Sequence, residues 1–331
     1  MSLVIIKPGI LDSLQDMGRY GHSHWGINPG GVMDVFAATV ANALVCNPAT
    51  AAVLELHFPA SQLLFEQNSL ISICGADFTP LLDGAPIPLW QPVLIRKNSI
   101  LHFRKQQKGA RCYIAVQGGF EASEWLGSCS THFKLALAGF NGRRLEKNDQ
   151  LLFKEPTVYF AALLTEGKRY SVLNWGASVY NSYAWPNEIF FIPGPQMHYL
   201  AANHKEFSAA NFTIHPSSDR MGYHLRGEAL TVNNTTEIIS TGVTRGTIQL
   251  LPSGQLVILM ADHQTTGGYP IIGTCIQAHL PKLAQLSASD VLQLLPVSIE
   301  VAEELFYRQQ QDLNLITWNC HLHLKELLCK A

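Results

Sequence analysis

Short apolar runs separated by turn residues dominate this chain, and most of them have the length and composition of β-strands. The clearest runs span residues 69–74, 92–96, 100–104, 111–117, 247–251 and 255–261. Gly, Pro, Asn and Asp mark the boundaries between them, as is typical of a β-rich protein. Two of these boundaries, 97–99 and 252–254, predict hairpins between the runs that flank them.

Helical patterns are few. Asp34 is placed to cap a helix over 35–45, in which the apolar positions share one face. A short helix is predicted near 281–285, and Ser298 is placed to cap a third helix that runs to about Gln310. The pattern as a whole predicts a mainly β fold with a few peripheral helices.

The length of 331 residues is sufficient for two lobes. We expect an N-terminal β-rich lobe with one helix over 1–160, a connector over 161–186 and a C-terminal β-barrel lobe over 187–298. Residues 299–331 then form a helix and an apolar tail. The tail is too apolar for a loose end, so we expect it to pack on the body of the protein or to cover a partner's surface.

Composition narrows the class of protein. The net charge is −2 and the basic residues do not cluster, so we expect no nucleic-acid partner. No apolar run approaches the roughly 18 residues of a membrane span, and the N-terminus has no basic start typical of a signal peptide. The seven cysteines are scattered without a C-x-x-C pair, which favours a reducing, cytoplasmic location.

Several common linear motifs are missing. The chain has no P-loop, no dinucleotide-binding G-x-G-x-x-G after a strand, no H-E-x-x-H and no G-x-S-x-G. The histidines and cysteines offer no clear set of three ligands, so we predict no metal site. If this protein takes part in ATP chemistry, we expect ATP to bind another chain or a site that no linear sequence motif marks.

The segment 262–270, Asp-His-Gln-Thr-Thr-Gly-Gly-Tyr-Pro, is the most informative stretch. It follows an apolar strand and places a carboxylate, an imidazole, an amide, hydroxyls and a phenol within nine residues. Its two adjacent glycines allow the backbone to bend or to approach a ligand closely. Taken alone, a site wall and an ordinary polar turn fit it equally well. Its candidate site residues are Asp262, His263, Gln264, Thr265, Thr266 and Tyr269.

Arg19 lies among glycines in a second candidate loop, over 15–34. A guanidinium presented there is suited to a carboxylate or a phosphate, which it binds at two points. The alternative is structural, with Arg19 paired to Asp16 or Asp34 to fix the loop. The sequence supports both interpretations equally.

Asp219 and Arg220 adjoin one another in a third polar loop, and Gln249 stands in a strand just upstream of the segment 262–270. Asp219 and Arg220 match the N–H donors and the carbonyl acceptor of an amide-like or ureido-like ligand. A simple salt bridge is the alternative for this pair. For Gln249 the alternative is an outward-facing amide on a strand.

Seven motifs in order along the chain carry a family resemblance. They are Gln15-Asp-x-Gly-Arg-x-Gly21, Gly31-x-Met-Asp34, Gly75-Ala-Asp77, Trp90-Gln-Pro92, Ser217-Ser-Asp-Arg-Met-Gly-Tyr223, Gly246-Thr-Ile-Gln249 and Asp262-x-Gln-Thr-Thr-Gly-Gly-Tyr-Pro270. Over about residues 3–297 the chain resembles the biotin-dependent carboxyltransferase subfamily. This subfamily includes the KipA-like C-type subunit of 5-oxoprolinase, formerly labelled allophanate hydrolase subunit 2, and half of the carboxyltransferase domain of urea carboxylase.

The resemblance implies cyclophilin-like β-barrel lobes and an ATP-dependent 5-oxoprolinase, which cleaves 5-oxo-L-proline to L-glutamate. Its implied partners are a KipI-like B-type subunit and a subunit-A-type (LamB/YcsF-like) protein, with ATP bound together with them. Asp219, Arg220 and Asp262 are then the expected catalytic residues. The expected substrate-binding residues are Arg19, Gln249, His263, Gln264, Thr265, Thr266 and Tyr269.

Two other functions are compatible with the resemblance. One is transfer of CO2 from carboxybiotin, held on a separate carrier, to urea or a similar amide. The other is a regulatory role in which the chain sequesters a KipI-like kinase inhibitor. Relatives usually carry arginine where this chain has Cys129 and His263, and this departure weakens the contact to an anionic substrate that the resemblance implies.

Overall fold

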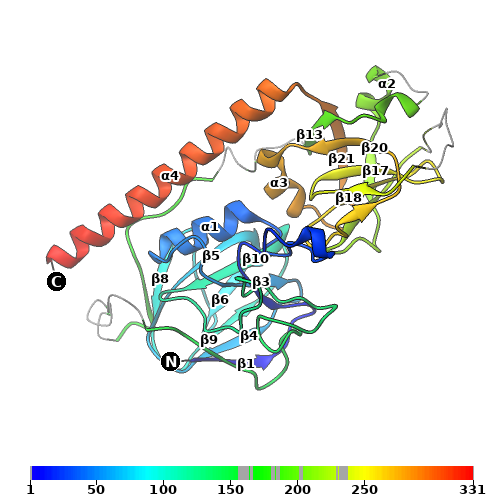
Figure 1. Ribbon diagram of the computed structural model, residues 1–331. Helices are drawn as coiled ribbons and strands as arrows, with labels where there is room; N and C mark the ends of the chain where they lie inside the picture. Colours follow the sequence, from blue (N-terminus) through cyan, green and yellow to red (C-terminus); the bar gives the residue numbers. More distant parts are fainter. Residues whose placement is uncertain are drawn as a thin grey trace. The chain divides into compact units, whose positions relative to one another are not determined.

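The computed structural model describes residues 2–155, 164, 167–179, 183, 187–200, 204–228, 230 and 238–330 (Figure 1). The chain forms two compact units. Unit 1 comprises Met1–Gly18, Asp34–Val179 and Gln311–Ala331, and unit 2 comprises Arg19–Met33 and Tyr180–Gln310. Strands predominate and helices are few, which confirms the predicted mainly β class. Parts of the connector expected over 161–186 lie outside the described residues.

Unit 1 contains two six-stranded antiparallel sheets. The first runs in the order β11 (Gln150–Leu152), β1 (Ser2–Lys7), β4 (Gln62–Phe65), β9 (Ser99–Phe103), β6 (Pro80–Leu82) and β7 (Ala85–Pro86). The second runs in the order β12 (Tyr170–Val172), β8 (Pro92–Ile95), β5 (Ser69–Asp77), β10 (Lys108–Val116), β3 (Val53–His57) and β2 (Ser13–Gln15). Both sheets contribute to one apolar core, in which Leu3 and Phe65 of the first sheet join Ile73 and Ile114 of the second.

Helix α1 (Val35–Leu44) lies on β5 and β10 of the second sheet (Figure 1). The carboxylate of Asp34 accepts a hydrogen bond from the backbone N–H of Ala37 (2.9 Å), which confirms the predicted cap. The hydroxyl of Ser72 on β5 donates to the carbonyl of Ala41 (2.6 Å) and ties the helix to the sheet.

The hairpin predicted across 97–99 was wrong, although both of its strands exist. β8 pairs with β5 in the second sheet, whereas β9 pairs with β4 and β6 in the first. Asn98 has a φ of +65°, and its backbone N–H donates to the carbonyl of Phe65 (2.6 Å), so the turn carries the chain from one sheet to the other. Both strands bury apolar side chains in the shared core, and this burial decides their pairing over the local turn signal.

Unit 2 is built on a closed seven-stranded barrel. Its order is β13 (Glu188–Pro193), β20 (Ile271–Cys275), β17 (Thr247–Leu250), β18 (Leu256–Leu259), β15 (Gly222–Arg226), β14 (Phe212–Ile214) and β21 (Val291–Pro296). A parallel pairing of β21 with β13 closes the barrel. β17 and β18 form the hairpin predicted across 252–254, in which Gly254 has a φ of +79°.

The remaining helices are short except for the last one. They are α2 (His204–Ala209), α3 (Leu280–Ala284), α4 (Ile299–Lys330) and the 3-10 helices η1 (Ser23–Trp25), η4 (Met197–Tyr199) and η5 (Gln277–His279). In the part of the chain that the structure describes, no helix is both long and apolar enough to cross a membrane.

The predicted end of the last helix near Gln310 was wrong, because α4 continues to Lys330. Its residues up to 310 belong to unit 2 and the later ones to unit 1. Leu313 and Cys320, seven residues apart, are buried on one side of the helix. Packing of that side stabilises helical turns that local propensity alone leaves marginal.

Candidate functional site

The site in unit 2 is organised around Arg220 and Asp262. Arg220 precedes β15 and Asp262 follows β18; these strands are antiparallel neighbours, so the two loops emerge at the same end of the barrel. The guanidinium Nε lies 2.8 Å from Oδ2 of the carboxylate, and Nη2 lies 3.1 Å from Oδ1. The backbone N–H of Asp262 also donates to the carbonyl of Arg220 (2.8 Å). Nη2 donates further to the carbonyl of Gly31 (2.6 Å), so the Arg220 side chain binds groups of the protein itself.

The segment Arg19–Met33, far away in sequence, belongs to this unit and surrounds the ion pair. The side-chain amide of Asn28 donates to the carbonyl of Asp262 (2.9 Å). Nη1 of Arg245 donates to the carbonyl of Val32 (3.1 Å). The sequence did not predict the roles of Asn28 and Arg245. The only local signal was the glycine content of the segment, which leaves its backbone carbonyls accessible to long side chains.

Arg19 is buried in the same segment, with 1% of its surface exposed. Its backbone N–H donates to the carbonyl of Pro29 (2.8 Å). Gly30 has a φ of +63°, and a Cβ built there would lie 3.1 Å from Nη1 of Arg19 and 3.7 Å from Oδ1 of Asp262. The backbone of Gly30 therefore passes close to both charged groups, where a side chain would crowd them.

Asp16, one of the structural partners considered for Arg19, lies in unit 1 and is held by other donors. Its carboxylate accepts hydrogen bonds from the hydroxyls of Ser128 and Ser130 (each 2.6 Å) and from the backbone N–H of Cys129 (2.6 Å). The backbone of Cys129 thereby contributes to fixing this loop. Burial raises the pKa of its thiol.

His263 is buried, with 3% of its surface exposed, and burial favours the neutral imidazole. Burial is the main factor that lowers the pKa of its imidazole, and the nearby guanidinium of Arg245 lowers it further. Nδ1 lies 2.5 Å from the carbonyl oxygen of Gln264, which only accepts, so Nδ1 carries the proton. In the neutral ring Nε2 then holds the lone pair, and His263 offers an acceptor at this position.

Gln249 on β17 lies beneath the segment 262–270. It is 2% exposed, and a Cβ built on Gly267 would lie 2.2 Å from its Nε2. Gly267 belongs to β19 (Thr266–Gly267), which pairs with β16 (Thr241–Gly242). Among the described residues, Nε2 of Gln249 has no hydrogen-bond acceptor. A buried donor of this kind is suited to a ligand carbonyl, because leaving it unpaired costs about 1–3 kcal/mol.

The other predicted residues have different surroundings. Oδ1 of Asp219 accepts from the backbone N–H groups of Met221 (2.8 Å) and Gly222 (3.3 Å), so its carboxylate stabilises its own turn. The exposed side chains of the segment 262–270 are those of Gln264, Thr266 and Tyr269, while Thr265 is half-buried. The structure thus brings Arg19, Arg220 and Asp262 together and leaves a polar, accessible rim beyond them.

Comparison with known proteins gives one consistent family. A family model described as the carboxyltransferase domain, subdomain A and B, matches residues 25–296. The chain is 32% identical over 320 residues to the C subunit of 5-oxoprolinase from Escherichia coli, which covers 96% of this chain and 99% of that protein. It is 30% identical over 305 residues to the protein of the same name in Haemophilus influenzae, covering 88% and 90%. The solved structure of Kluyveromyces lactis urea carboxylase matches with a TM-score of 0.84 at 25% identity, over 95% of this chain and 29% of that one.

Proposed function

This chain belongs to the family of carboxyltransferase domains with subdomains A and B, and from that premise we propose that it is a subunit of an ATP-dependent 5-oxoprolinase. One observation carries the proposal: two relatives named as the C subunit of 5-oxoprolinase match it over nearly the full length of both chains. The urea carboxylase, in contrast, contains the matching region as less than a third of a longer chain. The reaction is the cleavage of 5-oxo-L-proline to L-glutamate in the cytoplasm.

The word subunit in the relatives' names supports action in a complex. The partners we propose are a KipI-like B-type subunit and a subunit-A-type (LamB/YcsF-like) protein. The contacts of this chain's own residues suggest what it contributes. The Arg220–Asp262 pair fixes the loop that carries the segment 262–270. Hydrogen bonds from Arg220 to the carbonyl of Gly31 and from Asn28 to the carbonyl of Asp262 stabilise the pair.

We propose that two side-chain nitrogens recognise the lactam. Nε2–H of Gln249, which has no acceptor among the described residues, is suited to the lactam carbonyl, and the lone pair of Nε2 on His263 is suited to the lactam N–H. Gln264, Thr265, Thr266 and Tyr269 form the wall of the site. Arg19, which also has contacts within the protein, lies near Asp262 and would add positive charge on that side for the substrate carboxylate. Asp219 and Arg220 then act as positioning residues, because their polar atoms bind the protein backbone and Asp262.

The residues at this site do not fit a bound triphosphate. The guanidinium of Arg220 is bound by Asp262 and Gly31, and that of Arg245 by the carbonyls of Val32 and Met33. Neither arginine is presented to a phosphate chain. We therefore propose that ATP binds to the partner subunits.

Reconstitution tests the proposal. The chain is co-purified with the products of the neighbouring genes, and ADP and glutamate release are measured with 5-oxoproline, with urea and without substrate. We expect equal amounts of ADP and glutamate, formed only with 5-oxoproline and only when this chain is present. ADP release that is the same with and without 5-oxoproline would overturn the proposal.

The likeness to the K. lactis urea carboxylase favours a second candidate, transfer of CO2 from carboxybiotin to urea or a similar amide. A lactam and a ureido group both present a carbonyl beside N–H groups, so Gln249 and His263 suit either. Biotin would reside on a separate carrier. Avidin separates the two functions: it abolishes a carboxybiotin-dependent reaction and leaves the 5-oxoprolinase reaction unchanged.

A further inference from the structure

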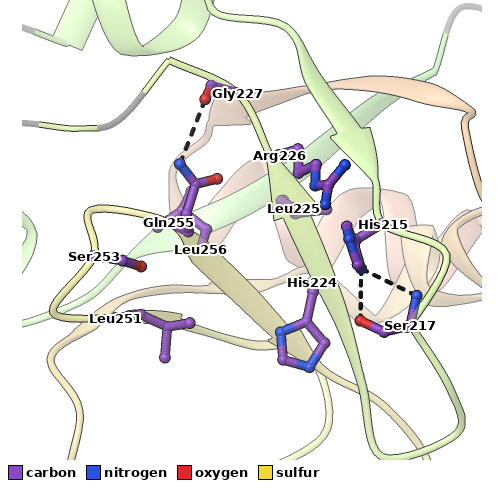
Figure 2. A pocket seen from close by; sticks show the side chains of 10 residues that line it. All are labelled: His215, Ser217, His224, Leu225, Arg226, Gly227, Leu251, Ser253, Gln255 and Leu256. Atoms are coloured by element: carbon purple, nitrogen blue, oxygen red, sulfur yellow. Dashed lines mark hydrogen bonds between the residues drawn. The ribbon is translucent and has the colours of Figure 1, made fainter.

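A cavity of about 470 Å³ opens on the outer surface of the barrel in unit 2 (Figure 2). Its polar lining residues are His215, Ser217, His224, Arg226, Ser253 and Gln255. They come from the end of β14, from β15 and from the turn between β17 and β18. Of these residues only Ser217 belongs to a motif noted in the sequence, and none contributes to the ion pair of Arg220 and Asp262.

The register of β14 and β15 explains why the basic residues gather on one face. Ile214 pairs with Leu225, and the next pair follows because the backbone N–H of His215 donates to the carbonyl of His224 (2.8 Å). Ile214 and Leu225 are buried in the barrel, so the side chains of His215 and His224 point outward. Arg226, two residues after His224, points to the same side.

Local hydrogen bonds fix the His215 ring and its protonation. The backbone N–H of Ser217 donates to Nδ1 of His215 (3.1 Å), and the Ser217 hydroxyl lies 2.6 Å from the same nitrogen (Figure 2). Because a backbone N–H only donates, Nδ1 is an acceptor, and the neutral ring carries its proton on Nε2. His215 therefore keeps one N–H donor available for a ligand.

The cavity lining is basic, with no carboxylate among its residues. Glu228, two residues after Arg226, is exposed and lies outside this lining, and two other acidic groups of the surrounding loops are bound elsewhere. Asp219 accepts from the backbone of its own turn, and Asp290 accepts from the backbone N–H of Ser287 (2.7 Å). Desolvation is the main factor that lowers the pKa of His215, and the charges of Arg226 and His224 lower it further. This mutual repulsion is what a bound anion relieves.

We propose that this cavity binds a small oxyanion, namely the phosphate or carboxylate group of a small molecule. The guanidinium of Arg226 provides the permanent charge and a planar pair of donors. The imidazoles of His215 and His224 and the hydroxyl of Ser253 provide further donors around it, while the Ser217 hydroxyl donates to Nδ1 of His215 and fixes that ring. Leu251 supplies an apolar surface beside them for the body of the ligand. The inference is independent of the proposed function and uses none of its residues.

The test is an NMR titration of the full chain with labelled histidines. Inorganic phosphate and, separately, acetate are added at constant ionic strength against chloride. We expect saturable chemical-shift changes at the rings of both His215 and His224 and a pKa of His215 raised by about one unit, which corresponds to about tenfold tighter binding by its protonated ring. Comparison of the two anions distinguishes a phosphate site from a carboxylate site.

Two variants and a control make the result specific. Arg226→Gln removes the permanent charge and is expected to weaken binding at least tenfold, and His224→Asn to weaken it several-fold. Arg308→Gln removes the same charge from an exposed position on α4 and is expected to leave binding unchanged. The proposal would be overturned if the histidine chemical shifts saturate with neither phosphate nor acetate. It would also be overturned if the titration of Arg226→Gln equals that of the parent chain.

Discussion

Arg220 and Asp262 form a two-point ion pair, with Nε to Oδ2 at 2.8 Å and Nη2 to Oδ1 at 3.1 Å, that joins two loops at one end of the barrel. The pair connects the loop before β15 to the start of the segment 262–270. Because Nη2 also binds the carbonyl of Gly31, the same guanidinium fixes a third stretch of chain. The conformation of the glycine-rich segment therefore depends on a charge pair that is nearly shielded from solvent.

Removing one partner should leave the other charge without its counter-ion in a mostly buried position, since the side chains are 5% exposed for Arg220 and 20% for Asp262. We expect Arg220→Gln and Asp262→Asn each to lower the free energy of unfolding by about 3 kcal/mol, the usual size for a broken buried pair. The double variant should lose much less than the sum of the two, because the partners are coupled. Urea unfolding of the four proteins measures the coupling.

The exposed pair of Arg308 and Glu304 on α4 is the control for this cycle. Its double-variant cycle should give a coupling below about 1 kcal/mol, as is usual for surface pairs. Strictly additive losses for Arg220 and Asp262 would show that the ion pair does not fix the loops.

A second prediction concerns the two adjacent glycines of the segment. The Cβ of Gly267→Ala would lie 2.2 Å from Nε2 of Gln249 and 3.3 Å from Cγ1 of Val243, so the amide has to move. In Gly268→Ala the nearest atom is the Ser240 hydroxyl at 3.2 Å. We expect Gly267→Ala to reduce kcat/KM of the reconstituted complex at least tenfold and Gly268→Ala to change it less than threefold. Equal effects would argue against a role of Gln249 in substrate recognition.

The sequence predicted those parts of the fold that local chemistry determines. The Asp34 cap and the hairpin across 252–254 depend on residues close together in the chain, and both are present. The pairing of β8 and β9 could not be deduced, because the choice between sheets depends on the core that the whole of unit 1 creates. The continuation of α4 was missed for the same reason, since burial of Leu313 and Cys320 depends on tertiary packing.

In the candidate site, too, the sequence predicted what local residues determine and missed what depends on tertiary packing. Polar residue types near glycine indicated the segment 262–270, and the structure places Arg220 directly against Asp262. What no local pattern revealed is that Arg19–Met33 folds with the C-terminal barrel. The tautomer of His263 could not be predicted from the sequence either, because it depends on the hydrogen bond to the carbonyl oxygen of Gln264 and on burial.

His279 leads to a third prediction, on stability in acid. Its Nδ1 accepts a hydrogen bond from the backbone N–H of Phe190 (3.0 Å), and burial is the main factor that lowers its pKa from 6.5 to about 4. Between these pH values the unfolded chain binds the proton and the native state does not. The stabilisation is therefore complete above about pH 6.5 and is lost as the pH falls through 4, by about 3 kcal/mol in all.

The matched variant is His279→Asn, whose side-chain oxygen can accept the same hydrogen bond but does not titrate. We expect the free energy of unfolding of this variant to lack the part of the acid-induced loss that His279 contributes. Urea unfolding at pH 7, 5.5 and 4.5 measures the difference. A variant that follows the parent protein over this range would contradict the assignment.

Asp12 leads to a prediction of opposite sign over an overlapping pH range. Its carboxyl is 1% exposed and accepts from the backbone of His57 (2.9 Å) and from the backbone and hydroxyl of Ser61 (2.7 and 2.6 Å). Burial outweighs these hydrogen bonds and raises its pKa from 3.8 to about 6. Between about pH 4 and pH 6 the native state therefore keeps the proton and the unfolded chain releases it. This stabilisation of the native state is complete below about pH 4 and is lost as the pH rises through 6, by about 3 kcal/mol. Asp12→Asn should remove that slope whatever its effect on absolute stability, and the same unfolding series measures it. A slope equal to that of the parent protein would show that Asp12 is ionised in the folded state.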